Sequence, residues 1–310
     1  MAAQRMLLPD GRWHLQHGPM DIVIGAEGDA AAVQAAHARA WSRFAALLDE
    51  LVAELPLLRQ PVKAGPCPLR GGVARRMWQA CAPFRAGFIT PMAAVAGAVA
   101  QELVTCYQRD GVRRAWINDG GDIALHLAPG ASVRIGLYAD LARLRPEDVV
   151  AGISTDGKFD VTHAMPVRGV ATSGWRGRSF SLGIADAVTV LATTAAQADA
   201  AASMIANAVD IADARIVRRP ACTLKDNSDL GEIPVTVDVP PLGAVQVRQA
   251  LAAGLARARE LQAAGLVHAA FLVCQGQAVS AGAAVGDAVV PQIGLRATGC
   301  GVDEVGSVFA

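Results

Sequence analysis

Three short polar strings in this sequence carry the residue types needed to hold a phosphorylated cofactor and a metal ion. The first is Asn118-Asp119-Gly120-Gly121-Asp122, and the second is Ala171-Thr172-Ser173-Gly174. The third is a segment in which Asp199 and Ser203 stand four residues apart. Carboxylates and hydroxyls are oxygen donors suited to Mg²⁺, and glycines allow a ligand to approach the backbone closely. In this order the strings suggest one composite site.

The first string lies between two segments of strand character, so we expect it to form a turn. Gly120 and Gly121 can adopt positive φ angles. The carboxylates of Asp119 and Asp122 could hold a ribose hydroxyl or cap the amides of the loop. The alternative is an ordinary Asp-Gly hairpin turn that binds no ligand.

The second string ends a predicted strand. Thr172, Ser173 and Gly174 are followed in the same loop by Arg176 and Arg178. Hydroxyls, free amides and guanidinium groups together suit an anionic group such as a diphosphate. A Ser-Gly turn with two exposed arginines is the alternative interpretation.

The third string is predicted to lie on a helix. Residues four apart share a helix face, so Asp199 and Ser203 would stand about one turn apart on the same side. A carboxylate and a hydroxyl there could be two ligands of Mg²⁺, which usually takes waters and substrate phosphates as its other ligands. The alternative is a polar pair that only forms hydrogen bonds within a helix of small residues.

Histidine is scarce in the middle of the chain. His163, in a loop before the second string, is the better candidate for an acid or base, because His126 falls inside a predicted strand. A loop histidine without a catalytic role is the alternative. The sequence contains no G-x-S-x-G, Walker or H-E-x-x-H motif, so it assigns no catalytic residue.

Two helices are predicted before the first string. Apolar residues at helical spacing predict a long amphipathic helix from its N-cap, Asp29, to Pro56. Prolines and glycines interrupt residues 56–90, which favours an irregular connection with at most one short strand. Pro91 then begins a helix over residues 92–108 that is apolar nearly all round and is therefore expected to be buried.

Beyond that helix the pattern changes to short strands. Residues 115–117 and 123–127 are predicted to form a hairpin around the Asp-Gly-Gly turn, and residues 132–138 to add a third strand of an antiparallel meander. The later predicted elements are strands at 167–172 and 187–192, a helix at 195–211 capped by Thr194, a strand at 235–239, a helix at 245–264 and a final hairpin from Phe271.

Composition limits the class of protein. The length of 310 residues suits one domain over residues 1–310 or two intertwined lobes within it, and a content of 53% hydrophobic and 18% charged residues is ample for a core. The formal net charge is zero, so the chain lacks the excess of basic over acidic residues that is typical of nucleic-acid-binding proteins. Six scattered cysteines without a C-x-x-C pair are typical of reduced thiols: Cys67, Cys81, Cys106, Cys222, Cys274 and Cys300.

The chain shows no targeting or membrane signal. Residues 1–17 lack the long apolar region of a signal peptide. The most apolar stretch, residues 92–104, is too short to span a bilayer. We therefore expect a soluble, cytoplasmic protein.

In this order the strings resemble the ApbE family of flavin transferases, which use Mg²⁺ to split FAD and attach FMN to a Thr or Ser of a partner protein. The similarity covers residues 90–211 and implies an α+β, ApbE-like fold, with antiparallel β-sheets flanked by helices. The matching segments are Gly120-Gly121-Asp122, Ala171-Thr172-Ser173-Gly174, Val188-Thr189-Val190 and Ala198-Asp199-Ala200.

The resemblance also implies roles for individual residues. Asp199 and Ser203 would bind magnesium, with Ser203 standing where the family usually has Thr. A backbone carbonyl near Ala93 or Ala94 would be the remaining protein ligand. The implied nucleotide-binding residues are Asn118, Asp119, Gly120, Gly121, Asp122, Thr172, Ser173 and Gly174.

Two features of the family are absent here. The family's Gly-x-x-x-Lys-Gly corresponds to residues 92–97, which contain no lysine. Its His-Ile-Ile-Asp-Pro loop corresponds to residues 175–187, which contain no histidine. The chain is more similar to a branch without assigned activity, in which Thr-Pro-Met-Ala-Ala-Val-Ala-Gly and Ser-Asp-Leu-Gly recur, here at residues 90–97 and 228–231.

Three functions remain open. The first is a divergent Mg²⁺-dependent transferase or hydrolase that acts on FAD or a related nucleotide cofactor, with an acceptor protein as a partner of the transferase. The second is a flavin- or nucleotide-binding protein that has lost transfer, which the missing lysine and loop favour. The third is an enzyme in the biosynthesis of another cofactor. Apolar helix faces could also pair two copies of the chain as a homodimer.

Overall fold

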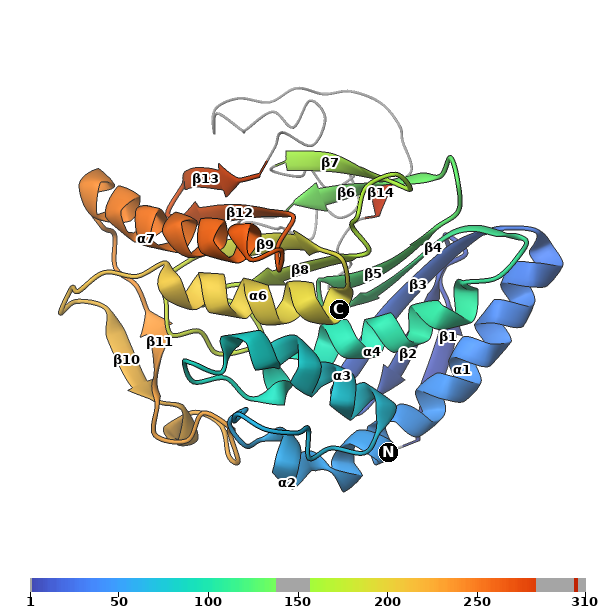
Figure 1. Ribbon diagram of the computed structural model, residues 1–310, viewed down its shortest axis with the longest axis horizontal. Coiled ribbons are helices and arrows are strands. Elements are labelled where there is room, and N and C mark those ends of the chain that lie inside the picture. The colour runs from blue at the N-terminus through green and yellow to red at the C-terminus, as the bar shows by residue number, and fades with distance from the viewer. Residues whose placement is uncertain (1, 138–156, 283–303, 306–310) are drawn as a thin grey trace.

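The structure of the protein, a computed structural model, describes residues 2–137, 157–282 and 304–305. Its framework is a nine-stranded sheet in which all neighbouring strands run antiparallel (Figure 1). Its strands are, in order across the sheet, β1 (Gln4–Leu7), β2 (Trp13–His17), β3 (Met20–Gly28), β4 (Val112–Asp119), β5 (Asp122–Leu127), β8 (Gly169–Ser173), β9 (Ala187–Ala192), β12 (Ala269–Cys274) and β13 (Gln277–Ala281). One layer thus joins segments from both halves of the chain.

Helices cover one face of this sheet (Figure 1). Two of them, α4 (Val95–Val104) and α6 (Ala195–Ala208), pack against each other and against its central strands. The others are α1 (Ala30–Ala53), α2 (Leu55–Leu58), α3 (Gly72–Cys81), α7 (Ala244–Ala263) and the single turns η1 (Ala82–Phe84), η2 (Pro91–Ala94), η3 (Thr105–Tyr107) and η5 (Ala221–Thr223). The central pair carries the third string and the buried helix that contacts it.

A small sheet packs on the other side of the molecule. It consists of β14 (Glu304–Val305), β6 (Ser132–Leu137) and β7 (Gly157–Thr162). A core that includes Ile123, Val133 and Val161 fills the space between this sheet and the large one. The pair β10 (Val217–Pro220) and β11 (Pro234–Asp238) stands apart at the lower left of Figure 1. The expected α+β fold, with antiparallel sheets flanked by helices, is confirmed.

Several central elements agree with the sequence. Helix α1 follows its N-cap, Asp29, and α4 is buried on most of its surface. The β4–β5 hairpin turns at Gly120 and Gly121, whose φ angles are +63° and +108°. Thr194 caps α6, because its hydroxyl accepts a hydrogen bond from Gln197 N at 3.3 Å. Each of these features depends on residues close together in the sequence.

The predicted meander is wrong. Strand β6 does not lie beside β5; it pairs with β7, and β8 takes the place beside β5. The chain leaves the large sheet at Pro129 and Gly130, where proline cannot donate a ladder hydrogen bond and glycine adopts a φ of +79°. Tyr138, the last residue of the predicted strand, and Cys300 lie outside the described residues.

Two other predictions are corrected by the structure. The strand expected within residues 56–90 is not among the described elements; α3 lies there, and its buried residues Val73, Met77 and Cys81 recur at helical spacing. Pro56 does not end α1 directly, because α1 ends at Ala53 and Pro56 lies in the short α2. Strands β1 to β3, at the start of the chain, were not predicted.

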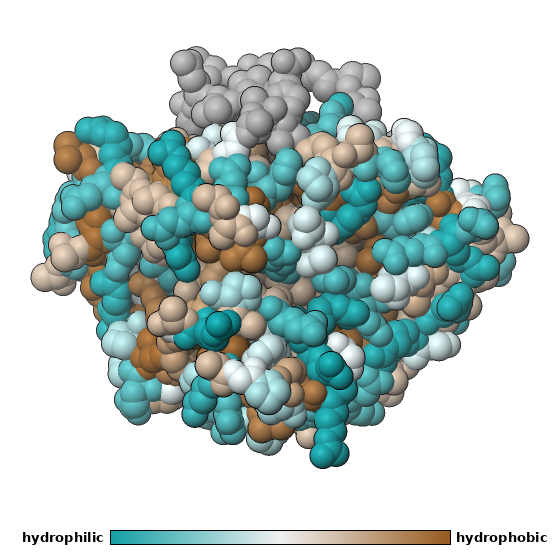
Figure 2. All heavy atoms as spheres, viewed as in Figure 1, coloured by the Kyte–Doolittle hydropathy of each residue, from teal (hydrophilic) through white to brown (hydrophobic). Residues whose placement is uncertain are grey.

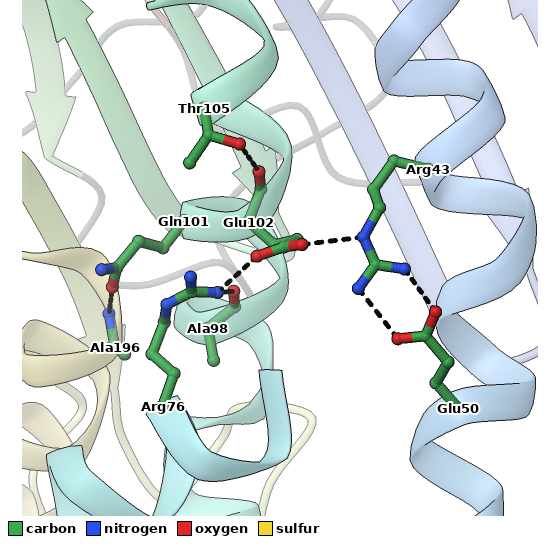
Figure 3. A network of polar contacts seen from close by, with 8 residues as sticks. All are labelled: Arg43, Glu50, Arg76, Ala98, Gln101, Glu102, Thr105 and Ala196. Atoms are coloured by element: carbon green, nitrogen blue, oxygen red, sulfur yellow. Dashed lines mark hydrogen bonds and ion pairs between the residues drawn. The ribbon is translucent and has the colours of Figure 1, made fainter. Parts of the chain in front are cut away.

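Helix α4 is fixed to three neighbouring helices by polar contacts (Figure 3). Glu102 accepts hydrogen bonds from Arg43 of α1 at 2.7 Å and from Arg76 of α3 at 2.8 Å. Gln101 Oε1 accepts a hydrogen bond from Ala196 N, in the first turn of α6, at 3.3 Å. Burial alone would raise the pKa of Glu102, but the two arginines outweigh it and leave that pKa lowered. The network therefore holds a charged carboxylate between helices.

On the helical side, polar and apolar side chains intermingle at the surface (Figure 2). Brown atoms are more frequent over the left half, where Figure 1 places α6, α7 and the β10–β11 pair. Exposed large apolar residues of this region are Val217, Leu224 and Val245. In the parts of the chain that the structure describes, no helix has the length and apolar character needed to cross a membrane.

Candidate functional site

The β4–β5 hairpin places two carboxylates of the first string opposite each other. Asp119 ends β4 and Asp122 begins β5, and the two residues are paired in the ladder. Asn118 Oδ1 closes the turn by accepting a hydrogen bond from Gly121 N at 2.8 Å. Asn118 Nδ2 is buried and has no hydrogen-bond acceptor among the described residues. The turn is thus well held but leaves one buried donor unsatisfied.

Both carboxylates face the helical layer. Side chains alternate along a strand, so Asp119 shares a face with Ile117, and Asp122 shares a face with Ala124. Ile117 and Ala124 belong to the core cluster that also contains residues of α4. Asp119 is buried, whereas Asp122 keeps some exposure to solvent.

The second string joins the first through a hydrogen bond. Asp122 Oδ1 accepts a hydrogen bond from Thr172 N at 3.2 Å, across 50 residues of sequence. The Thr172 hydroxyl lies 2.9 Å from the Thr189 hydroxyl on the next strand. Ser173 ends β8, and Gly174 follows where a Cβ would lie 2.3 Å from Asp186 O. A glycine is therefore required at that position.

The third string lies on α6, which packs against α4. Asp199 Oδ2 accepts a hydrogen bond from Gly97 N of α4 at 2.9 Å. Ser203 follows one turn later on the same helix, and both side chains keep some exposure to solvent. A Cβ at Gly97 would lie 2.3 Å from Ala195 O. The close approach of the two helices at Gly97 therefore brings the backbone amide to Asp199.

The carboxyl groups of Asp119, Asp122 and Asp199 all have raised pKa values, and the charge of Asp119 acts on the other two. Burial raises the pKa of Asp119 to about 7, and the positive charge of Arg178 opposes this rise. Burial also raises the pKa of Asp199 to about 7, against the hydrogen bond from Gly97 and with added repulsion from Asp119. The pKa of Asp122 lies well above its usual value, first through burial and then through the charges of Asp199 and Asp119. The three strings therefore form one electrostatic unit.

A divalent cation would relieve the repulsion within this unit. The Asp199 carboxylate and the Ser203 hydroxyl are oxygen donors, and the η2 turn, with the backbone carbonyls of Ala93 and Ala94, packs against α6. An all-oxygen donor set suits Mg²⁺, which commonly uses one or two carboxylates. In the described ranges, no group of three or more His, Cys, Asp or Glu side chains is arranged to hold a metal ion. Asp199 and Ser203 are therefore suited to a magnesium ion that takes few protein side chains as ligands.

Other candidates from the sequence have different positions. Arg176 lies over the ring of Trp175, 4.9 Å from its centroid, and Arg178 donates a hydrogen bond to Pro19 O at 3.2 Å. His163 Nδ1 lies 2.7 Å from Leu127 O. Leu127 ends β5, five residues from Asp122, so the histidine contacts the strand about 17 Å from the carboxylate. The structure does not bring His163 to the three strings.

Sequence reasoning gave no role to three residues near this unit. Thr90 is buried and donates a hydrogen bond to Asp229. Burial raises the pKa of the Cys81 thiol, and the charges of Asp199 and Asp229 raise it further. The only signal in the sequence was that Thr90 and Asp229 belong to the two segments recurring in the similar branch. Because Thr90 and Asp229 lie 139 residues apart, no local sequence pattern indicated their contact.

The chain matches known proteins over most of its length. A sequence model of the family described as "AbpE bacteria" matches residues 5–280, a range that contains all three strings. A UPF0280 protein of Methanospirillum hungatei is 38% identical over 135 residues, which are 43% of this chain and 50% of that protein. A UPF0280 protein of Methanopyrus kandleri is 35% identical over 193 residues, which are 60% of this chain and 69% of that protein. The chain thus spans about half the length of the first relative and about two thirds of the second.

A solved structure also resembles this chain. The apo form of the flavinyl transferase ApbE of Pseudomonas stutzeri aligns with 91% of this chain and 95% of that chain. The two sequences are 13% identical, and the TM-score is 0.41.

Proposed function

The chain belongs to the AbpE bacteria family, and on this premise we propose that it is a divergent Mg²⁺-dependent transferase or hydrolase acting on FAD or a related nucleotide cofactor. The observation that carries the proposal is the meeting of the three strings. Asp122 accepts a hydrogen bond from Thr172 and lies within electrostatic range of Asp199. The proximity of these three segments, each of which carries oxygen donors, supports one shared site for the cofactor and the ion.

The metal would be held on α6. Asp199 and Ser203, with a backbone carbonyl of Ala93 or Ala94, would bind Mg²⁺. When bound, the ion would neutralise the charge that develops on a diphosphate. Gly97 N donates a hydrogen bond to one oxygen of the Asp199 carboxylate, which would leave the other oxygen available to the ion.

The nucleotide would lie along the two turns. Among the described residues, no atom lies within 4 Å of the place that a Cβ at Gly121 would take, so a ligand group could approach the hairpin backbone there. Asn118 Nδ2 is a buried donor that an oxygen of the ligand could satisfy. The remaining nucleotide contacts would come from Asp119, Gly120, Asp122, Thr172, Ser173 and Gly174.

A flavin- or nucleotide-binding protein without transfer activity is the second candidate. The loop after Gly174 is short and closed, because Trp175 N donates a hydrogen bond to Ala185 O at 3.0 Å. It contains no histidine that could accept the proton of an acceptor hydroxyl, and residues 92–97 contain no lysine. A transferase would need a hydroxyl-bearing acceptor protein as its partner, whereas a binding protein would not.

Calorimetry tests whether the protein binds a nucleotide at all, and the measurement of released AMP tests whether it also cleaves FAD. Purified protein is titrated with FAD, FMN and ADP in the presence of Mg²⁺, and AMP released from FAD is measured by chromatography. Asp199→Asn should abolish Mg²⁺-dependent binding, and Asp226→Asn, on an exposed loop, should leave it unchanged.

Each outcome has a defined meaning. Binding with release of AMP supports the transferase or hydrolase. Binding without release, both for the protein alone and with a hydroxyl-bearing acceptor protein present, supports the second candidate. If none of the three nucleotides binds, both candidates are wrong. Native mass spectrometry of freshly purified protein would identify a ligand retained from the cell.

A further inference from the structure

The segment between β10 and β11 forms a compact tip that folds back on itself. Cys222 N donates a hydrogen bond to Gly231 O at 2.8 Å, and Ile233 N donates one to Leu230 O at 3.0 Å. Asn227 and Gly231 have φ angles of +56° and +52°, which reverse the direction of the chain. The tip therefore keeps its shape through its own backbone.

One side chain of this tip reaches the helical layer. Asp229 Oδ2 accepts a hydrogen bond from Thr90 Oγ1, across 139 residues of sequence. Thr90 is only 2% exposed, and Asp229 is partly buried. A hydroxyl buried to this degree needs a partner, and a carboxylate is a strong one. The contact thus connects the tip with the start of the η2 turn.

Thr90 controls the geometry of that turn. Its carbonyl accepts a hydrogen bond from Ala93 N at 3.1 Å. Ala94 is fully buried and belongs to the same core cluster as Ala198 of α6. The Pro91–Ala94 turn is therefore held by Thr90 at one end and by α6 at the other.

A buried thiol shows how close the tip comes to α6. Cys81 is completely inaccessible to solvent, and its pKa is raised by burial first and then by the charges of Asp199 and Asp229. The thiol lies within electrostatic range of both carboxylates, although one belongs to α6 and the other to the tip. The tip and α6 therefore each place a carboxylate in the neighbourhood of this thiol.

We propose that Asp229 is a positioning residue that acts on the metal site through Thr90. By holding Thr90 it fixes the Pro91–Ala94 turn, whose backbone carbonyls would share the cation with Asp199. Mg²⁺ tolerates little departure from octahedral geometry, so a displaced carbonyl weakens binding. The loss of such an outer partner typically reduces metal affinity about 10- to 100-fold. This inference rests on the proposed function.

The test uses Mn²⁺ as a spectroscopic substitute for Mg²⁺. The free ion is measured by electron paramagnetic resonance while the full chain is titrated, without nucleotide. Asp229→Ala and the nearly isosteric Thr90→Val should each raise the Mn²⁺ Kd about tenfold. Thr90→Ser keeps the hydroxyl and should retain the wild-type Kd. Asp226→Ala, on the same tip, is the matched control and should also retain it.

The double variant decides whether the two residues act together. Asp229→Ala with Thr90→Val should bind Mn²⁺ as weakly as either single variant, because both remove the same contact. The inference would be overturned if the losses of Mn²⁺ affinity multiplied in the double variant. It would also be overturned if the folded Thr90→Val protein bound Mn²⁺ with a Kd within twofold of that of the wild type. Asp199→Asn distinguishes the two proposals: if it leaves Mn²⁺ binding intact, the metal site of the proposed function is itself wrong.

Discussion

The backbone amide of Gly97 donates a 2.9 Å hydrogen bond to the Asp199 carboxylate, across 102 residues of sequence. The bond exists because α4 and α6 approach each other more closely than any side chain at position 97 would allow. The carboxylate is thereby oriented by a backbone group whose position is fixed by helix packing. The orientation of the Asp199 carboxylate therefore requires no hydrogen bond from another side chain.

Gly97→Ala should destabilise the fold and weaken metal binding. The new methyl group would lie 2.3 Å from Ala195 O and 2.9 Å from Asp199 Cβ, so α4 and α6 would have to separate. We expect a loss of about 3 kcal/mol in the free energy of unfolding, measured by urea denaturation. Gly72→Ala is the matched control, since a Cβ there meets no atom within 4 Å and should be neutral or slightly stabilising. Equal effects of the two variants would contradict the packing argument.

Asp119 should make the fold more stable at lower pH. Burial raises its folded-state pKa from 3.8 to about 7, so the folded protein binds this proton more tightly than the unfolded chain. The resulting stabilisation is fully present below pH 3.8 and is lost as the pH rises through about 7. Between these values the wild type should gain up to about 1.4 kcal/mol per unit fall in pH relative to Asp119→Asn.

Denaturation curves at several pH values, without divalent cations, measure this difference. Asp226→Asn should show the same pH dependence as the wild type, because Asp226 lies on the exposed tip between β10 and β11. An Asp119→Asn curve parallel to that of the wild type would show that Asp119 is not buried as a carboxylic acid.

Removal of the Ser203 hydroxyl should weaken magnesium binding. If the hydroxyl is a ligand, Ser203→Ala raises the Mg²⁺ Kd about tenfold, or about 1.4 kcal/mol. Ser203→Thr keeps the donor and should retain the affinity. Calorimetric titration with Mg²⁺ measures both, and Ser42→Ala, on the exposed face of α1, controls for the loss of a helix serine. A Ser203→Ala protein with unchanged affinity would remove Ser203 from the proposed site.

Glu102→Gln should destabilise the helical layer. The substitution removes the charge that accepts hydrogen bonds from Arg43 and Arg76 (Figure 3). Because the Glu102 carboxylate is partly buried, we expect a loss of about 1–3 kcal/mol in the free energy of unfolding. Glu260→Gln breaks an exposed ion pair with Arg257 and should cost less than about 0.5 kcal/mol. Comparable losses in thermal or urea denaturation would show that the network contributes no more than a surface pair.

The sequence alone determined the local features of the site. The Asp-Gly-Gly turn follows from glycines that tolerate positive φ between two strands. The start of α6 follows from Thr194, whose hydroxyl accepts a hydrogen bond only three residues away. The shared face of Asp199 and Ser203 follows from helix periodicity. Each conclusion depends on interactions within about one turn of chain.

Only the tertiary structure decided which segments meet. The place beside β5 belongs to β8, not to β6, because the chain leaves the large sheet at Pro129, and β6 and β7 pack their apolar faces against that sheet as a second layer. The bonds from Gly97 to Asp199 and from Thr90 to Asp229 join residues more than 100 positions apart. No local pattern encodes such contacts, since they arise when the helices and the sheet bury their apolar faces together.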